Sequence, residues 1–143
     1  MNIDYNIDKI QKISSEIYGS LELLEELKHL SNDELINNKH MVSSAKYNLI
    51  VAIEGMIDLC NHVISVNGWG APVDYADAFA ILCNKGAFDK DSLELYVKMT
   101  RFRNRLVHIY WEVDSNYLQE ILHSHLDDIK KFLKQFNIFI GIV

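Results

Sequence analysis

The chain has 143 residues, 49% of them hydrophobic and 24% charged, which is the balance of an ordinary globular protein. This length allows a hydrophobic core without disulfides or metals, so we expect one domain over residues 1–143. The net charge of −6 argues against a nucleic-acid coat protein, because such a protein carries a broad basic face. No apolar run approaches the roughly 20 residues that span a membrane, and the N-terminus lacks the pattern of a signal peptide. We therefore expect a cytoplasmic protein with no membrane association, in which Cys60 and Cys83 stay reduced.

Apolar residues at helical spacing dominate the first half of the chain. Residues 4–30 carry isoleucines and leucines at intervals of three, four or seven, which predicts one amphipathic helix. Ser31-Asn32-Asp33 then offers turn and N-cap chemistry. A second long helix is expected from about residue 34 to 66, and its broad apolar surface indicates a central position against more than one neighbour.

Turn and cap residues divide the second half. The segment 67–72 holds the only proline and is the clearest break in the chain. A short helix capped by Asp74 should run to about Cys83. Asp91-Ser92-Leu93-Glu94 is typical of a capping box that starts the next helix, and Asp114 or Ser115 should cap the last one. The chain is therefore predicted to be an all-α bundle of five or six helices.

The most basic segment of this acidic chain also carries the most chemistry. It holds four of the 14 Lys and Arg residues, namely Lys98, Arg101, Arg103 and Arg105. His108 follows five residues after Arg103. An arginine grips a phosphate with two N–H donors and stays charged, whereas a histidine can give or take a proton near neutral pH. The pair suits cleavage of a phosphodiester.

Arg103, His108 and Tyr110 form an R-x4-H-x-Y string, which reads here Arg-Asn-x-x-Val-His-x-Tyr. This string resembles the signature of the HepT-like toxins, a family within the HEPN superfamily of small helical ribonucleases. The resemblance extends over the helical layout from about residue 5 to 135, and it implies a HEPN-like fold. It also implies that Arg103 binds the scissile phosphate and stabilises the transition state, while His108 transfers a proton.

The same resemblance implies a metal-independent endoribonuclease toxin of a toxin–antitoxin module, with RNA as its substrate. A ribose 2′-hydroxyl would attack the adjacent phosphorus. The antitoxin would be a nucleotidyltransferase that adenylylates Tyr110, and the added AMP would block the site by its charge and volume. The alternative role for Tyr110 is that of a packed aromatic beside Trp111. HEPN proteins commonly dimerise so that two motifs line one cleft, which implies a homodimer.

Helix geometry complicates a site within one chain. On an ideal α-helix Arg103 and His108 lie about 140° apart around the axis, whereas Asn104 and His108 share a face. Either the helix starts or bends within the motif, or two copies of the protein share the site. The resemblance favours the shared site, and the residues alone leave both possibilities open.

Several neighbours could support the motif. Asn104 could orient His108, bond a phosphate oxygen, or bond the backbone as a helix-interior amide. Lys98, Arg101 and Arg105 are possible RNA contacts. Glu54, Asp58 and His62 form a polar strip that is either an exposed edge or a source of a carboxylate that reaches the motif. For that second role the resemblance favours Asp58, which would orient His108 or pair with an arginine.

Other kinds of site find little support. His123 and His125 are too close in sequence to share a helical face and lack carboxylates at ligand spacing, so we expect no metal site and no cofactor. The chain has no glycine-rich phosphate loop. Two other functions stay open: a catalytically inactive HEPN module that binds RNA, nucleotide or a nucleotidyltransferase, and a purely structural helical dimerisation domain.

Overall fold

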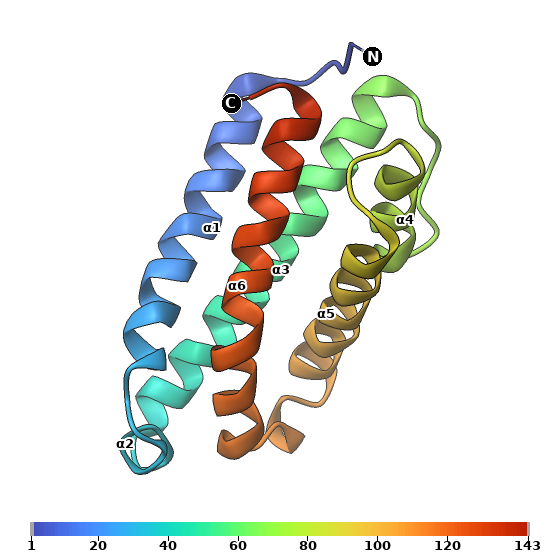
Figure 1. The fold of residues 1–143 in the computed structure, drawn as a ribbon. Helices are drawn as coiled ribbons and strands as arrows, with labels where there is room; N and C mark the ends of the chain where they lie inside the picture. Colours follow the sequence, from blue (N-terminus) through green and yellow to red (C-terminus); the bar gives the residue numbers. More distant parts are fainter. Residues whose placement is uncertain (1, 143) are drawn as a thin grey trace.

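A computed structural model describes residues 2–142 and confirms the predicted all-α bundle (Figure 1). Within this range the secondary structure is entirely helical. In chain order the elements are α1 (Ile7–Lys28), α2 (Asn32–Ile36), α3 (Lys39–Asn67), α4 (Tyr75–Asn84), α5 (Lys90–His108), a short 3₁₀ helix η1 (Tyr110–Glu112) and α6 (Ser115–Ile140).

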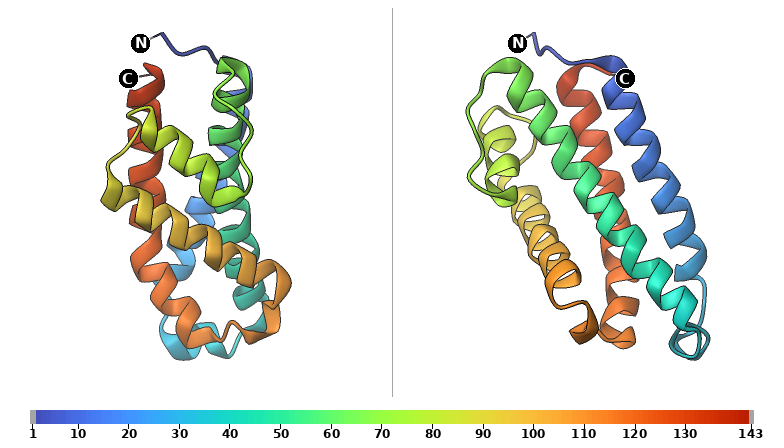
Figure 2. Two further views of the ribbon diagram at one scale, coloured as in Figure 1. Left: turned by 90° about the vertical axis from the view of Figure 1, so that its right-hand side faces the viewer. Right: turned by 180° about the vertical axis from the view of Figure 1, so that it is seen from behind.

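The long helix α3 lies at the centre, as its broad apolar surface predicts, and it packs against each of the other five α-helices. Helices α1, α3 and α6 lie side by side, and α4 and α5 cover one flank (Figures 1 and 2). The described chain ends lie together at one end of the bundle, while α2, η1 and the start of α6 lie at the other (Figure 1). The last turn of α5 is therefore far from both ends of the chain.

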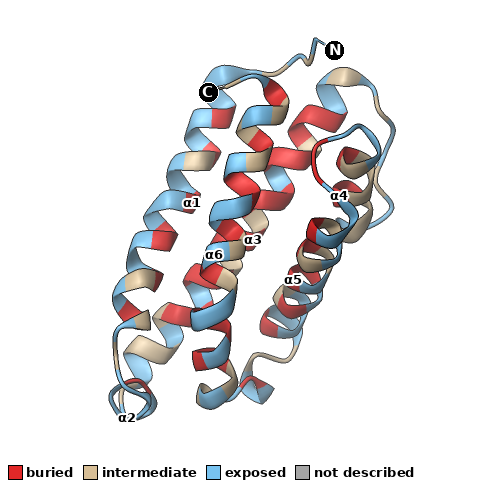
Figure 3. Cartoon of the chain, viewed as in Figure 1, coloured by how far each residue is buried: buried red, intermediate tan, exposed pale blue. Residues whose placement is uncertain are grey.

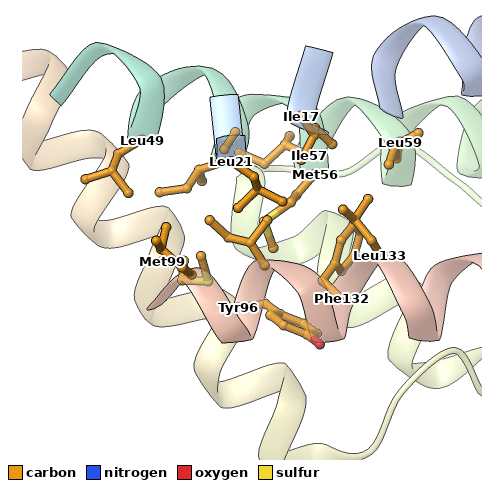
Figure 4. Close-up of a cluster of buried hydrophobic side chains, with 14 of the residues drawn as sticks. Ile17, Leu21, Leu49, Met56, Ile57, Leu59, Tyr96, Met99, Phe132 and Leu133 are labelled. Carbon is orange, nitrogen blue, oxygen red and sulfur yellow. The ribbon is translucent and has the colours of Figure 1, made fainter. Parts of the chain in front are cut away.

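The core consists of apolar side chains that face inward from every α-helix (Figure 3). Figure 4 shows its middle, where Ile17, Met56, Tyr96 and Phe132 come together from α1, α3, α5 and α6. The ring of Tyr96 packs edge-on against Phe132 at a centroid distance of 5.3 Å. Such aromatic pairs stabilise a core by roughly 0.5–1.5 kcal/mol beyond the area that they bury.

Helix α1 approaches α3 closely because residue 55 is a glycine. A Cβ atom at Gly55 would lie 2.4 Å from Cγ1 of Ile17, closer than two carbon atoms can approach. Only glycine permits this contact. The α1–α3 interface is thus fixed next to Glu54.

By length and composition α3 could also cross a membrane, which the sequence analysis did not anticipate. However, 61% of its apolar window is buried inside the bundle. The apolar residues of α3 are therefore accounted for by its position as the core helix.

The second predicted helix is divided in two, which corrects the expected span of residues 34 to 66. Ser31 caps α2 in a capping box with Glu34, and α2 ends after Ile36. Asn38 then caps α3, because its side-chain oxygen accepts hydrogen bonds from the backbone N–H groups of His40 and Met41. A carboxamide that satisfies two free N–H donors stabilises a new helix start at this point.

The start of α5 is a second correction. Asp89, not Asp91, is the N-cap residue, and its carboxylate accepts from the backbone N–H of Ser92 at 2.8 Å. Hydrogen bonding to the side chain of Ser92, and next to its backbone N–H, lowers the pKa of Asp89. Asp74 and Asp114 cap α4 and α6 as predicted.

Candidate functional site

The motif occupies the C-terminal turns of α5, and Arg103 and His108 lie in the same α-helix. The helix ends at His108, and the backbone of Ile109 leaves the helical region at φ −134°. The N–H of Ile109 still bonds the carbonyl oxygen of Arg105 at 2.9 Å, and η1 then begins at Tyr110. The helix therefore does not start within the motif. A start there was one of the two ways in which Arg103 and His108 could have come together within one chain, the other being a bend.

Arg103 points toward α3 and is held there by three side chains. Its Nε and Nη2 atoms donate to one carboxylate oxygen of Glu54 at 3.1 and 2.5 Å. Its Nη1 atom donates to the side-chain oxygen of Asn104 at 3.0 Å. The guanidinium also lies over the ring of Tyr75, the first residue of α4, at 4.8 Å from the ring centre. Helices α3, α4 and α5 therefore fix the orientation of the guanidinium together.

This arrangement restrains Arg103 without using up its donors. A guanidinium carries five N–H groups, and the bonds to Glu54 and Asn104 occupy three of them. The remaining two, one each on Nη1 and Nη2, could bind a phosphate. The Arg103 side chain is only 12% exposed, so a phosphate can reach the guanidinium only through the small part of its surface that is open to solvent.

His108 has different surroundings. It is exposed at the end of α5, and in the described range 2–142 its ring takes part in no hydrogen bond or ion pair. Helix geometry turns it about 140° from Arg103, so the two side chains leave α5 in different directions. An imidazole in this setting is accessible to a ligand.

The expected RNA contacts lie on the His108 side of α5. Lys98, Arg101 and Arg105 recur at three and four residues, which places them with His108 within about 80° of the helix circumference. All four are exposed. The guanidinium of Arg105 lies 5.2 Å from the ring centre of Tyr117 on α6. We call Lys98, Arg101 and Arg105 the basic stripe.

Tyr110 is held by a residue that the sequence analysis missed. The ammonium group of Lys46, on α3, donates to the backbone carbonyl of Tyr110 at 2.9 Å and lies 4.3 Å from the centre of its ring. Lys46 is only 6% exposed, and its burial lowers its pKa, an effect that the charge of Asp114 opposes. A lysine between apolar positions of a core helix was the available signal, since a buried lysine needs a partner.

The polar strip on α3 divides into three separate roles. Glu54, rather than the favoured Asp58, pairs with Arg103, because the Glu54 carboxylate lies opposite the guanidinium while Asp58 is one turn further along. In the described chain neither carboxylate bonds His108. His62 accepts a hydrogen bond from the backbone N–H of Asn6 at 2.9 Å and so anchors the segment before α1.

Asp58 lines a groove between α1 and α3. Burial raises its pKa, and the negative charges of Glu54 and Glu16 raise it further, while Lys9 opposes them. The groove has a volume of about 1000 Å³ and runs between α1 and α3. It includes neither Arg103 nor His108. A smaller hollow of about 130 Å³, lined by Glu54, Ile57, Asp58 and Tyr75, lies beside the Arg103 ion pair.

None of the five main pockets of the described chain includes Arg103 or His108. Within residues 2–142 no three His, Cys, Asp or Glu side chains are close enough to hold a metal ion. The candidate site is therefore one fixed guanidinium, one free imidazole and a basic stripe, distributed around the end of a single helix.

Comparison with known proteins places the chain in a family. Residues 17–136 match the family model described as Ribonuclease HepT-like. The mRNA nuclease HepT of Shewanella oneidensis is 28% identical over 86 residues, which make up 60% of this chain. The chain spans 65% of the length of that relative.

Solved structures share the fold. A tri-AMPylated HEPN toxin of Shewanella oneidensis, in complex with an MNT antitoxin, superposes with a TM-score of 0.83 at 21% identity, over 92% of this chain and 98% of that one. The cytosolic protein YutE of Bacillus subtilis gives a TM-score of 0.83 at 19% identity, over 97% of this chain and 93% of that one. At these identities the likeness concerns the fold. Because the family model matches most of this chain, from residue 17 to residue 136, the chain belongs to the HepT-like ribonuclease family.

Proposed function

We propose that this chain is a metal-independent endoribonuclease toxin, active in the cytoplasm as a homodimer and silenced by a nucleotidyltransferase antitoxin. The observation that carries the proposal is the state of the motif. Arg103 is oriented by Glu54 and Asn104 but keeps two free N–H donors, and His108 is exposed at the end of the same helix. The relative in Shewanella oneidensis is named an mRNA nuclease, and YutE is described as cytosolic.

The chemistry follows from these two groups. Arg103 binds the non-bridging oxygens of the scissile phosphate and stabilises the charge that develops on them. His108 takes the proton of the ribose 2′-hydroxyl as its oxygen forms a bond to phosphorus and the bond to the 5′ oxygen breaks. The leaving 5′ oxygen takes a proton from solvent, and His108 later releases its own proton to solvent. The products are a 2′,3′-cyclic phosphate and a 5′-hydroxyl, and no metal takes part.

The dimer supplies what one chain lacks. Arg103 and His108 leave α5 in directions about 140° apart, so they cannot grip one phosphate from opposite sides within a single copy. A twofold axis near the end of α5 brings Arg103 of one copy toward the partner's His108. Such an interface presents the same patch from both subunits, as twofold interfaces do.

Two further residues support the site. Asn104 fixes one edge of the guanidinium, since it accepts from Nη1 of Arg103. Asp58 lies one turn beyond Glu54 and lines with it the hollow beside the Arg103 ion pair, where it could bind a polar group of the substrate. The basic stripe, formed by Lys98, Arg101 and Arg105, contacts the phosphates that flank the scissile one. Arginine and lysine contacts of this kind position the strand without selecting its sequence.

Tyr110 is the proposed point of control. Structural relatives include a tri-AMPylated HEPN toxin in complex with an MNT antitoxin and a toxin–antitoxin complex with AMP-PNP. Tyr110 lies two residues beyond His108, and its ring is half-buried against Lys46. A nucleotidyltransferase antitoxin that adds AMP to the phenol tethers a phosphate that can reach Arg103 or Arg105, where it competes with RNA.

The test compares RNA cleavage by the wild type with that by Arg103→Ala and His108→Ala, with and without EDTA. Loss of the base typically costs about 10²–10⁴ in rate and loss of one phosphate donor about 10²–10³. Both variants should therefore be nearly inactive, while circular dichroism shows an unchanged helix content. EDTA should change nothing. Cleavage that survives both substitutions, or that stops with the chelator, refutes the mechanism. RNA binding without cleavage by the wild type would identify an inactive binding module instead.

A further inference from the structure

One large aromatic side chain beside the site has no role in the mechanism above. Trp111 follows Tyr110 in η1 and is 77% exposed. The other tryptophan, Trp69, is partly buried and packs against Phe139 at a centroid distance of 6.0 Å. A folded protein rarely leaves an indole in solvent, because burial of this side chain is strongly favourable.

The exposure of Trp111 does not reflect a loose segment. The ammonium group of Lys46 bonds the carbonyl oxygen of Tyr110 directly before it, and the N–H of Glu112 directly after it bonds the carbonyl oxygen of Ile109 at 2.9 Å. Val113, two residues further along, is buried in the core. The turn is thus fixed on both sides of Trp111, and the indole is presented on a rigid support.

The surroundings of Trp111 match one class of ligand. Three virtual bonds of about 3.8 Å separate it from His108, so the two Cα atoms lie within about 11 Å of each other. The basic stripe runs along α5 toward this point, and its residues are exposed. Cationic side chains that follow a strand and end at an exposed aromatic ring are the elements with which proteins bind single-stranded nucleic acid.

We propose that Trp111 is a base-stacking subsite, on which an unpaired nucleobase next to the scissile phosphate rests while the basic stripe binds the flanking phosphates. The inference rests on the proposed function and assigns it a substrate class, single-stranded RNA. Because every base has a π-face, the subsite selects an unstacked strand and not a sequence. A base in a duplex is already stacked on its neighbours and is excluded.

The experiment measures binding of a short single-stranded oligonucleotide of mixed sequence with 2′-O-methyl riboses, which cannot be cleaved through the 2′ oxygen. Base–aromatic stacking is worth about 1–3 kcal/mol, so Trp111→Ala should weaken binding about 5- to 150-fold. Trp111→Phe keeps a ring and should retain most of the affinity. Tyr18→Ala, which removes an exposed ring from α1, is the matched control and should bind as the wild type does.

A spectroscopic readout separates stacking from a structural effect. In Trp69→Phe the indole of Trp111 is the only tryptophan, and the oligonucleotide should quench its fluorescence. Unchanged affinity in Trp111→Ala, or unquenched fluorescence, overturns the proposal. So does a Trp111→Ala protein whose molar mass in light scattering differs from the wild type, because Trp111 then belongs to a subunit interface. Ring-dependent binding by a protein that cleaves no RNA supports the subsite while it refutes the nuclease.

Discussion

Glu54 and Lys46 lie eight residues apart on α3 and hold the two ends of the motif, Glu54 at Arg103 and Lys46 at Tyr110. Arg103 and Tyr110 are seven residues apart. The distance between them along α5 and η1 is therefore similar to the two helical turns that separate Glu54 from Lys46 on α3. The core helix thus contacts both Arg103, which we propose binds the phosphate, and Tyr110, which we propose is modified. Neither Glu54 nor Lys46 is part of the R-x4-H-x-Y string itself.

The first prediction concerns Glu54. Glu54→Gln keeps the shape of the side chain but removes the charge that attracts Arg103, so the guanidinium should leave its productive position. Misplacement of a catalytic group by about 1 Å can cost up to about 100-fold in rate, and we expect a loss of kcat approaching that size. Stability should change by less than about 1 kcal/mol, because the pair is partly exposed. Glu120→Gln, on the exposed side of α6, is the control, and equal kcat values in the two variants would contradict the role of Glu54.

The second prediction concerns Lys46. Lys46→Met keeps the aliphatic bulk but leaves the part-buried carbonyl oxygen of Tyr110 with only the longer bond of 3.4 Å from the backbone N–H of Val113. The free energy of unfolding should fall by about 0.5–1.5 kcal/mol, which is the usual net contribution of one hydrogen bond. Urea unfolding measures this difference, with the exposed Lys131→Met as the control. A Lys46→Met protein as stable as the wild type would mean that water replaces the ammonium group without cost.

The third prediction separates a shared site from two independent ones. A mixed dimer is purified with two affinity tags, one on an Arg103→Ala subunit and the other on a His108→Ala subunit. If Arg103 of one copy acts with the partner's His108, one of the two composite sites is intact, and about half of the wild-type activity should return. Each mutant homodimer should be inactive. An inactive mixed dimer would place Arg103 and His108 of one site in the same chain.

The fourth prediction concerns Tyr110. Tyr110→Phe removes only the phenolic oxygen, whereas Lys46 contacts the ring face and the backbone carbonyl. The variant should therefore fold normally and keep much of its nuclease activity. On co-expression with a nucleotidyltransferase antitoxin, mass spectrometry should find AMP on Tyr110 of the wild type and none on the variant, which stays toxic. A fully silenced Tyr110→Phe protein would show that the antitoxin acts by binding alone.

The fifth prediction follows from the raised pKa of Asp58. Ionisation of this carboxyl costs the folded state free energy, because burial and the negative charge of Glu54 oppose it. Near pH 7 the cost is fully present, and it disappears once the pH falls below the ordinary pKa of 3.8, where both states are protonated. Asp58→Asn should therefore be more stable than the wild type near pH 7, and urea unfolding should show the advantage shrinking toward acidic pH. An advantage that grows as the pH falls, or one equal to that of Asp127→Asn on α6, which lies outside the groove, would contradict this account, since Asp58 is itself exposed and owes its raised pKa to partial burial in the groove and to Glu54.

Local chemistry explains which helix boundaries the sequence predicts well. Asp74 and Asp114 cap their helices because each cap is decided within four residues, by one carboxylate and one nearby N–H. The break before α3 is harder to predict. The apolar period continues across it, and only the two hydrogen bonds accepted by Asn38 divide the helix. Periodicity reports which face is buried and does not report a local cap.

The candidate site divides in the same way. The motif string predicts which residues of α5 carry the chemistry, but their partners come from 49 and 64 residues away in sequence, at Glu54 and Lys46. Helical spacing treats Glu54 and Asp58 as equivalent, since they share a face one turn apart. The choice between them depends on how α3 sits against α5. That position is decided by side-chain packing across the bundle, which cannot be predicted from any single segment of the sequence.

Through Gly55, the orientation of Arg103 also depends on α1, on the opposite side of the bundle. The glycine is adjacent to Glu54, and Ile17 of α1 occupies the space where its side chain would be. Any larger residue at position 55 has to displace the fully buried side chain of Ile17, and an α3 that shifts to make room carries Glu54 away from Arg103. Helix α1 contributes no atom to the chemistry, yet a methyl group added at its interface would alter the aim of the guanidinium. A screen for loss of toxicity should therefore recover substitutions at Gly55 along with those in the motif.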